Sequence, residues 1–259
     1  MLYVFFVLCL TAALGGAINS VAGGGTLLTF PALFAALGDN RDAAAIANAT
    51  STLALFPGSV AALWGYRREI VQNRRWSLLL VTPSIIGGLT GSLLVVLYPD
   101  GFKLLVPWLI LTAAVLFCLQ PQIARLTGVG GSHAPARPLT IAGVVLFQLL
   151  VAIYGGYFGA GIGILMLSAL GIMGMTDIHE MNAVKILLAS LINGISAVIF
   201  VINGLVHWPY ALAMAAAAIV GGYLGARVAR QLDRRLVRAV VVAIGFVLAS
   251  YYFYKQLAA

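Results

Sequence analysis

The sequence predicts an all-α polytopic membrane protein built from two inverted repeats of about five membrane segments each. Three observations predict it: an apolar composition, a series of apolar runs of membrane-spanning length, and a glycine-rich stretch that recurs in the second half. Of the 259 residues, 62% are hydrophobic and only 8% are charged. A soluble domain is nearer a quarter charged, so this composition cannot cover a water-exposed surface.

Ten apolar runs are the predicted membrane segments. Most approach the ~20 residues needed to cross ~30 Å of hydrocarbon, and the second run of each half is shorter. They lie at 2–22, 26–37, 43–64, 77–98 and 103–119 in the first repeat (1–119), and at 139–157, 162–174, 181–203, 208–229 and 236–254 in the second (139–259). Between the repeats, the polar, Gly- and Pro-rich residues 120–138 are the predicted cytoplasmic connecting loop. The first run lacks a positive n-region, so we interpret it as a membrane helix rather than a signal peptide.

Matching residues and swapped arginines indicate the inverted repeat. IIGGLTGSLL aligns with the later IVGGYLGARV, Asn48 with Asn182, and Ser51 with Lys185. The segment 64–77, after the third run, is rich in arginine, whereas its counterpart after the eighth run has no arginine. In the other pair of segments the order is reversed: 227–238, after the ninth run, is rich in arginine, and its counterpart after the fourth run is poor in basic residues. Because basic residues accumulate in cytoplasmic loops, five crossings per repeat place both rich segments in the cytoplasm. The net charge of +8 is then topological, and no motif indicates a nucleic-acid partner.

The glycine-rich stretches NSVAGGGTLLTFP (19–31) and GGYFGAGIGILMLS (155–168) are predicted to break the helices. Each glycine costs roughly 1 kcal/mol against Ala in a helix interior. Breaks survive in a membrane only where protein or water covers the freed backbone groups. Two breaks at matching places in two halves point to a transporter's substrate site. Helices that begin after the glycines would offer amides and positive dipole ends to an anion.

The eighth run carries a polar stripe that contains a lysine. Asn182, Lys185, Asn193, Ser196 and Asn203 fall within about 80° of one another on a helix. Such a stripe faces protein or water, where it binds substrate or joins helices by hydrogen bonds. An intramembrane lysine is a functional candidate by default, and the alternative is that it snorkels towards the interface.

The positions of the acidic residues indicate helix capping and exclude cation binding and hydrolysis by paired acids. Asp177, His179 and Glu180 are expected to form its cap and first turn. All seven acidic residues lie in loops or at span ends, so no paired acids serve cation binding or hydrolysis. Cys9 and Cys118 match no metal-binding spacing. No catalytic residue, metal or cofactor is therefore expected.

The predicted substrate-binding residues combine backbone donors at the breaks with polar side chains of the third and eighth runs. They are Asn19, Gly23, Gly24, Gly25, Thr26, Asn48, Ser51, Gly159, Gly161, Gly163, Asn182, Lys185 and Asn193.

Several elements resemble the TauE/SafE family, also called the four-toluene-sulfonate uptake permease family. They are AGGGTLLTFPAL, NATSTLALFPGSVAALWGYR, the GG-x-x-G of the fourth and ninth runs, and GIGILMLSALGIMGMTDIHEMNAVK. The resemblance covers essentially the whole chain. It implies an inner-membrane carrier of sulfite, sulfonates or related organic anions.

We therefore expect a transporter of small anions in the inner (plasma) membrane, with a small anion and membrane lipid as partners. The membrane potential, negative inside, is worth about 2.3 kcal/mol per charge per 100 mV and favours anion exit. Export is thus expected, because import would need coupling to H⁺ or Na⁺. A passive anion channel and an integral-membrane enzyme are the alternatives, and a homodimer is one oligomeric state open to the chain.

Cysteine labelling tests the predicted topology. The segments 64–77, 120–138 and 227–238 should share the cytoplasmic side, and both termini should lie outside. Single cysteines placed in these segments should react with an impermeant reagent only after the inner face is opened. Labelling of either arginine-rich segment from outside in intact cells would contradict the inverted arrangement.

Overall fold

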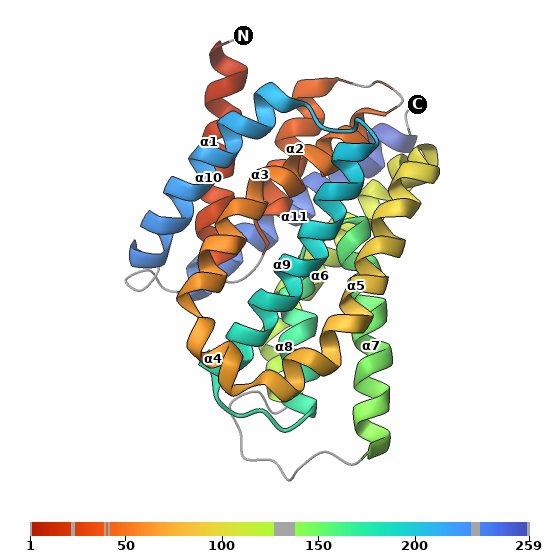
Figure 1. Cartoon of the computed structure of the whole chain (residues 1–259). Coiled ribbons are helices and arrows are strands. Elements are labelled where there is room, and N and C mark those ends of the chain that lie inside the picture. The colour runs from red at the N-terminus through yellow and green to blue at the C-terminus, as the bar shows by residue number, and fades with distance from the viewer. Residues whose placement is uncertain are drawn as a thin grey trace.

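The computed structural model describes residues 2–21, 24–38, 40, 42–126, 138–228 and 234–257, and every regular element within them is an α-helix. The helices are α1 (Leu2–Val21), α2 (Thr26–Leu37), α3 (Ala43–Gly65), α4 (Arg67–Gln72), α5 (Arg74–Leu97), α6 (Pro99–Leu126), α7 (Pro138–Tyr157), α8 (Ile162–Ile172), α9 (Ile178–Ile202), α10 (Trp208–Val228) and α11 (Arg234–Leu257). They form one bundle, with both ends of the chain at its upper end in Figure 1.

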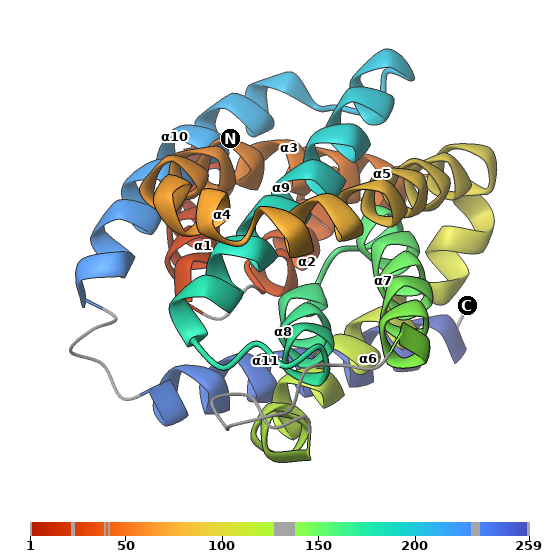
Figure 2. The same cartoon turned by 60° about the horizontal axis from the view of Figure 1, so that its bottom comes forward.

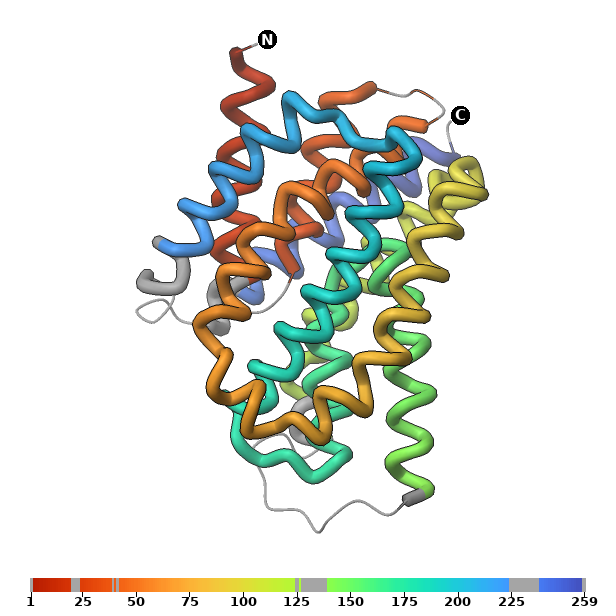
Figure 3. The backbone as a smooth tube through the Cα atoms, viewed as in Figure 1, coloured from red at the N-terminus to blue at the C-terminus, as the bar shows by residue number. Residues whose placement is uncertain are grey.

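Seven of the described helices are long and apolar enough to cross a membrane: α1, α3, α5, α6, α7, α9 and α11. The second helix of each half is too short. With 12 and 11 residues, α2 and α8 span about 18 and 16 Å, against ~30 Å of hydrocarbon. The prediction that the second segment of each half is short is thus confirmed. Each of these two helices is the second arm of a helical hairpin. The chain runs down α1 and returns along α2 to the end at which it began, and α7 and α8 do the same from the opposite end (Figures 1 and 3).

Two differences from the sequence prediction are larger than the shifts of up to four residues at the other helix ends. The short helix α4 occupies the arginine-rich segment that was expected to be a loop, and α6 continues to Leu126, into the expected connecting loop. The residues that follow Pro121 (Gln, Ile, Ala, Arg, Leu) are mostly good helix formers, which explains the extension. Residues 127–137 of that loop lie outside the described residues.

Glycines let two pairs of helices approach closely. In the α1–α10 pair, a Cβ at Gly16 would lie 2.3 Å from the Ala218 carbonyl oxygen, and one at Gly221 2.0 Å from that of Ala13. In the α5–α7 pair, a Cβ at Gly91 would lie 2.1 Å from the carbonyl oxygen of Ile153. Small residues at helix interfaces allow such contact in membranes. Helix packing therefore explains the glycines of the first GG-x-x-G motif and Gly221 of the second.

The remaining pairs complete the bundle. Helix α3 packs against α9, and α6 packs against α11. In Figure 2, α1 and α10 lie on one side of the bundle, α5 and α7 on the other, and α3 and α9 between them. A hydrogen bond from Gln148 Nε2 to Ser84 Oγ (2.9 Å) also joins α7 to α5.

Large apolar side chains cover the outer surface of the bundle. On α1, Tyr3, Phe6, Leu10 and Leu14 are all exposed, and their spacing of three or four residues places them on one face. In water such a stripe would be buried against another element, whereas in a bilayer lipid covers it. The chain is a multi-pass membrane protein.

Replacing Gly156 by Ala tests the close helix contact. Its Cβ would lie 2.3 Å from the Gly88 carbonyl oxygen, so α5 and α7 must separate. Overpacking of this kind costs about 1–3 kcal/mol, and the midpoint of thermal unfolding in detergent should fall. Gly143→Ala is the matched control on the same helix, because nothing lies within 4 Å of its Cβ. Equal midpoints for the two variants would contradict the packing role.

Candidate functional site

The break between α7 and α8 is built on left-handed glycines. Gly159 has φ +81° and Gly161 has φ +82°, a region that residues with a Cβ rarely adopt. The phenol of Tyr154 on α7 donates a hydrogen bond to the Ala160 carbonyl (2.9 Å) and so holds the break. Gly161 is the N-cap of α8 and has no side-chain cap. The first amides of α8, which include that of Gly163, therefore have no intrahelical partner.

The break between α1 and α2 depends on close packing. Gly24 and Gly25 are buried. A Cβ at Gly25 would lie 2.4 Å from the Gly15 carbonyl oxygen, and one at Gly24 would lie 2.2 Å from the ring of Phe117 on α6. Glycine is needed here because neighbouring groups fill the space of a side chain. Gly23, the first of the three consecutive glycines, lies outside the described residues.

A single turn of α6 contacts both breaks. Phe117 lies against Gly24, and a Cβ at Gly161 would meet the side chain of Leu116 at 3.5 Å. Because Leu116 and Phe117 are consecutive, the two breaks lie close together, although 137 positions separate the glycines in the sequence.

One turn of α3 also contacts both breaks. Asn48 Nδ2 donates to the carbonyl of Tyr157, the last residue of α7 (3.0 Å). One turn later, the hydroxyl of Ser51 is hydrogen-bonded to that of Thr29, which donates in turn to the carbonyl of Gly25 (3.1 Å). Since Thr29 has a single hydroxyl proton, Ser51 must be the donor between them. Two residues predicted to bind substrate therefore hold the breaks together.

Asn48 and Asn193 are the two polar side chains of the predicted set that lie at the α7–α8 break. Asn48 Oδ1 is buried and has no hydrogen-bond partner within the described part of the chain. Asn193 on α9 lies beside Gly159, with 3.8 Å between its Oδ1 and the position of a Cβ there. Buried polar atoms are normally paired, so the orphan oxygen of Asn48 is a candidate contact for a solute or a water molecule.

Lys185 is buried on α9, with 6% of its surface exposed. Its ammonium donates to Asn182 Oδ1 (2.9 Å), and Asn182 Nδ2 donates to the Ile178 carbonyl (2.8 Å). Among the described residues no carboxylate forms an ion pair with Lys185. Asp177 is used elsewhere, because it caps α9 by accepting from the amides of His179 (2.7 Å) and Glu180, as the sequence predicts.

Not all of the predicted residues meet at one point. Lys185 is eight residues from Asn193, which places it about 12 Å away along the helix axis. Asn19 is half-buried in the last turn of α1, and Thr26 begins α2. The structure therefore has a central region where the breaks meet, and an Asn182–Lys185 pair, of which Lys185 is buried, about two turns away along α9.

An aromatic cluster that the sequence analysis did not single out packs beside the breaks. The ring of Phe30, one turn after Gly25, lies 5.2 Å from that of Phe158 and 6.3 Å from that of Phe102. Phe102 also contacts the ring of Tyr157 (5.1 Å). These rings come from α2, α6, α7 and the α7–α8 break, so sequence spacing does not reveal the cluster.

Broken helices meet in the interior of this bundle, and polar side chains lie beside the breaks in surroundings that are otherwise apolar. These features define a polytopic membrane transporter. The family model described as "Sulfite exporter TauE/SafE" matches residues 8–252, and the chain belongs to this family. The resemblance of its sequence motifs is thereby confirmed.

Similar proteins include several named as transporters. The "Probable membrane transporter protein YfcA" of Escherichia coli (strain K12) is 27% identical over 96% of this chain and 90% of its own length. The "Probable membrane transporter protein" of Haemophilus influenzae is 28% identical over 92% of this chain and 90% of its own length. No solved structure matches the chain.

The contact between Gly24 and Phe117 can be tested by a compensating pair of substitutions. Gly24→Ala should lower thermal stability and transport, because its Cβ would enter the ring of Phe117. Phe117→Leu makes room, so the double variant should recover much of the lost unfolding midpoint. A double-mutant cycle on the midpoints measures the coupling, which should reach roughly 0.5–3 kcal/mol for residues in contact. Additive effects would contradict the packing of this break against α6.

Proposed function

We propose that this transporter exports small oxyanions, with sulfite and organic sulfonates as the substrate class, across the inner membrane. The observation that carries the proposal is the buried ammonium of Lys185 within a membrane-crossing helix. An uncompensated buried cation costs several kcal/mol, and an intramembrane charge marks a substrate or ion pathway. The name of the matched family supports sulfite as one member of the substrate class.

The amides at the two breaks are a second source of positive potential. The first turns of α2 and α8 both start at the centre of the bundle, and the first amides of α8, which include that of Gly163, have no intrahelical partner. Oriented amides and helix dipoles attract anions. In this proposal the anion passes two places on its way through the bundle. One is the break region, where Asn48 and Asn193 lie beside it, and the other is the Asn182–Lys185 pair.

We infer that the two halves form an inverted repeat, which provides the alternating access. Helix pairing supports this. By order in the two halves, α1 corresponds to α7, α3 to α9, α5 to α10 and α6 to α11. Exchanging each helix for its counterpart converts the contacting pair α1–α10 into the contacting pair α7–α5, and leaves the pairs α3–α9 and α6–α11 unchanged. The counterparts also run in opposite directions, since α1 leaves the upper end of the bundle and α7 leaves the lower end (Figure 1). Rocking of one half against the other would open the central region to each side in turn.

Replacing Lys185 tests the function. Lys185→Met keeps the bulk of the stem but removes the charge and its donors. Charge-assisted hydrogen bonds are worth ~1.5–3 kcal/mol, so sulfonate binding should weaken by roughly tenfold or more. Lys185→Arg should keep partial function, because the charge remains but the planar guanidinium fits differently. Calorimetric titration of the purified variants with sulfite and ethanesulfonate measures the change.

Arg68→Met is the control, because it removes an exposed cation from α4 and should leave the affinity unchanged. If Lys185 instead snorkels, Lys185→Arg should be fully active and Lys185→Met should bind with wild-type affinity, which would end the proposal. Saturation and counterflow of sulfite in proteoliposomes would identify a carrier, whereas a passive channel shows neither.

A further inference from the structure

A groove of about 380 Å³ lies between α3 and α9. Phe56, Val60 and Leu63 form its wall on α3, and residues between 190 and 199 form its wall on α9. The groove opens outwards, because Val60 is 44% exposed and Val198 is 55% exposed. Both helices are long and apolar enough to cross a membrane, so the opening faces lipid.

The apolar walls of the groove contain one polar side chain, that of Ser190. This residue is 4% exposed, and its hydroxyl has no hydrogen-bond partner among the described residues. A Cβ at Gly194 would lie 3.0 Å from the ring of Phe56, and α3 and α9 run in opposite directions (Figure 1). Ser190, one turn before Gly194, therefore lies on the side of this contact that is nearer α4. Since buried hydroxyls are normally paired, an occupant with a hydrogen-bond acceptor is expected there.

An arginine lies just beyond this end of the groove. Arg67 begins α4 one turn after Leu63, and its Nη1 donates to the Trp64 carbonyl (2.8 Å). Its guanidinium also lies 5.1 Å from the centre of the Trp64 ring. These contacts hold the side chain of Arg67 against the end of α3, and the residue remains exposed. An exposed Trp such as Trp64 is typical of the membrane–water interface, which places Arg67 at the level of the lipid headgroups.

No acidic side chain neutralises Arg67 within the part of the chain that the structure describes. Glu69 is the one acid of the segment 64–77. It is half-buried, and its Oε2 is buried without a hydrogen-bond partner among the described residues. The chemistry of the site therefore calls for an anion from outside the chain. The planar guanidinium of arginine suits phosphate, which it binds through two parallel hydrogen bonds.

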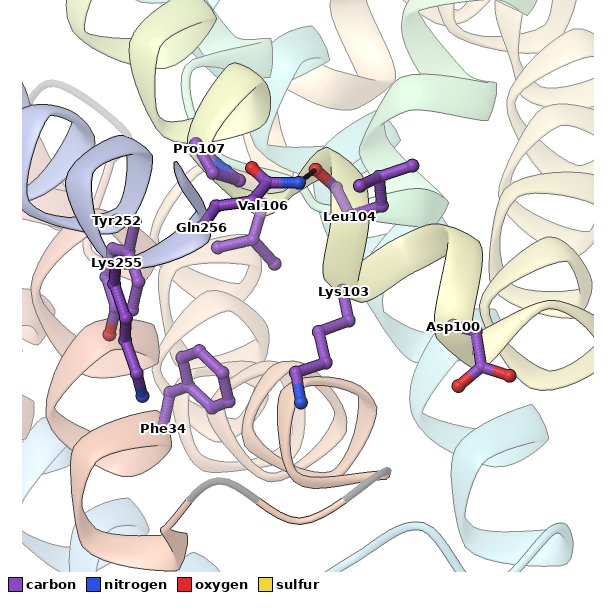
Figure 4. Close-up of a pocket in the computed structure, with 9 residues that line it drawn as sticks. All are labelled: Phe34, Asp100, Lys103, Leu104, Val106, Pro107, Tyr252, Lys255 and Gln256. Carbon is purple, nitrogen blue, oxygen red and sulfur yellow. Dashed lines mark hydrogen bonds between the residues drawn. The ribbon is translucent and has the colours of Figure 1, made fainter. Parts of the chain in front are cut away.

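The pocket at the opposite end of the bundle is a different kind of site. It has a volume of about 330 Å³, and Lys103, Lys255 and Phe34 are among its lining residues (Figure 4). The ring of Phe34 stacks on those of Phe30 and Tyr252. Both lysines already interact with other residues of the chain, so this pocket does not offer the uncompensated cation that Arg67 provides beside the groove.

We propose that the α3–α9 groove binds an anionic phospholipid, with the phosphate at Arg67, an ester carbonyl at Ser190 and an acyl chain between Phe56 and Val198. The occupant is a lipid because the walls are apolar over about 10 Å of α3 and open into hydrocarbon. It is anionic because basic side chains at the interface attract anionic lipids, whereas phosphatidylcholine carries its own compensating cation. Such a lipid would contact both α3, which holds the breaks, and α9, which carries Lys185.

Photocrosslinking in nanodiscs tests this site. The photoreactive residue p-benzoylphenylalanine is introduced at Val198 in the groove, or at the equally exposed Val220 of α10 as the matched control. The nanodiscs contain phosphatidylglycerol and phosphatidylcholine with identical chains in a ratio of about one to four. Mass spectrometry of the crosslinked products should show phosphatidylglycerol enriched by roughly threefold or more at 198, and the bulk ratio at 220.

Substitutions at the two polar groups connect this enrichment to the proposed contacts. Arg67→Gln should return the ratio at 198 to the bulk value, whereas Arg68→Gln, which removes an adjacent exposed cation, should leave the enrichment unchanged. Ser190→Ala should lower the enrichment without lowering the midpoint of thermal unfolding, because its hydroxyl has no partner to lose among the described residues. Ser196→Ala is its control, since Ser196 is an equally unpaired buried serine of α9 outside the groove.

Three results would overturn the proposal. The bulk lipid ratio at 198 in the unsubstituted protein would show that the groove does not select an anionic lipid. Enrichment that persists in Arg67→Gln would show that the guanidinium does not hold the phosphate. A crosslink from 198 to a second copy of the chain, in place of lipid, would show that the groove is an interface between protomers.

Discussion

Backbone amides and carbonyls that a broken helix releases cannot face lipid, and the rest of this structure depends on that constraint. Each unsatisfied group costs several kcal/mol in hydrocarbon. The two breaks therefore lie inside the bundle, where α3 and α6 cover both of them. Asn48 satisfies the carbonyl at the end of α7, and Thr29 satisfies that of Gly25. The same turn of α3 thereby joins the two halves of the chain.

Glycine serves two distinct purposes in this bundle. At Gly159 and Gly161 it permits a left-handed backbone, which turns α7 into α8. At Gly16, Gly91 and Gly221 the backbone is helical, and glycine instead allows a neighbouring helix to approach within the space of a methyl group. The first use creates the central region, and the second holds the α1–α10 and α5–α7 pairs that surround it. A glycine-rich membrane sequence therefore does not by itself mark a binding site.

Positive charge is distributed over three levels of the molecule. Lys185 lies on α9 about 12 Å from Asn193 at the break region, the first amides of α8 lie at the centre, and Lys103 and Lys255 lie at the end that carries the termini. Aromatic rings from Phe30 to Tyr252 separate the centre from the outer lysines. Under the proposed function, an anion that leaves the centre towards this end would need the rings to move.

The sequence by itself determined the membrane class, the positions of both breaks and, apart from α4 and the end of α6, the helix limits to within a few residues. Composition, run length and glycine act locally against a fixed bilayer thickness, which makes these features predictable. Only the tertiary structure decided that α2 and α8 return as hairpin arms, that Ser51 holds a break while Lys185 lies apart from it, and that Asn48 binds Tyr157 across 109 positions. These contacts join helices remote in sequence. Periodicity shows which face of a helix is polar, but the partner of that face depends on how all the helices pack.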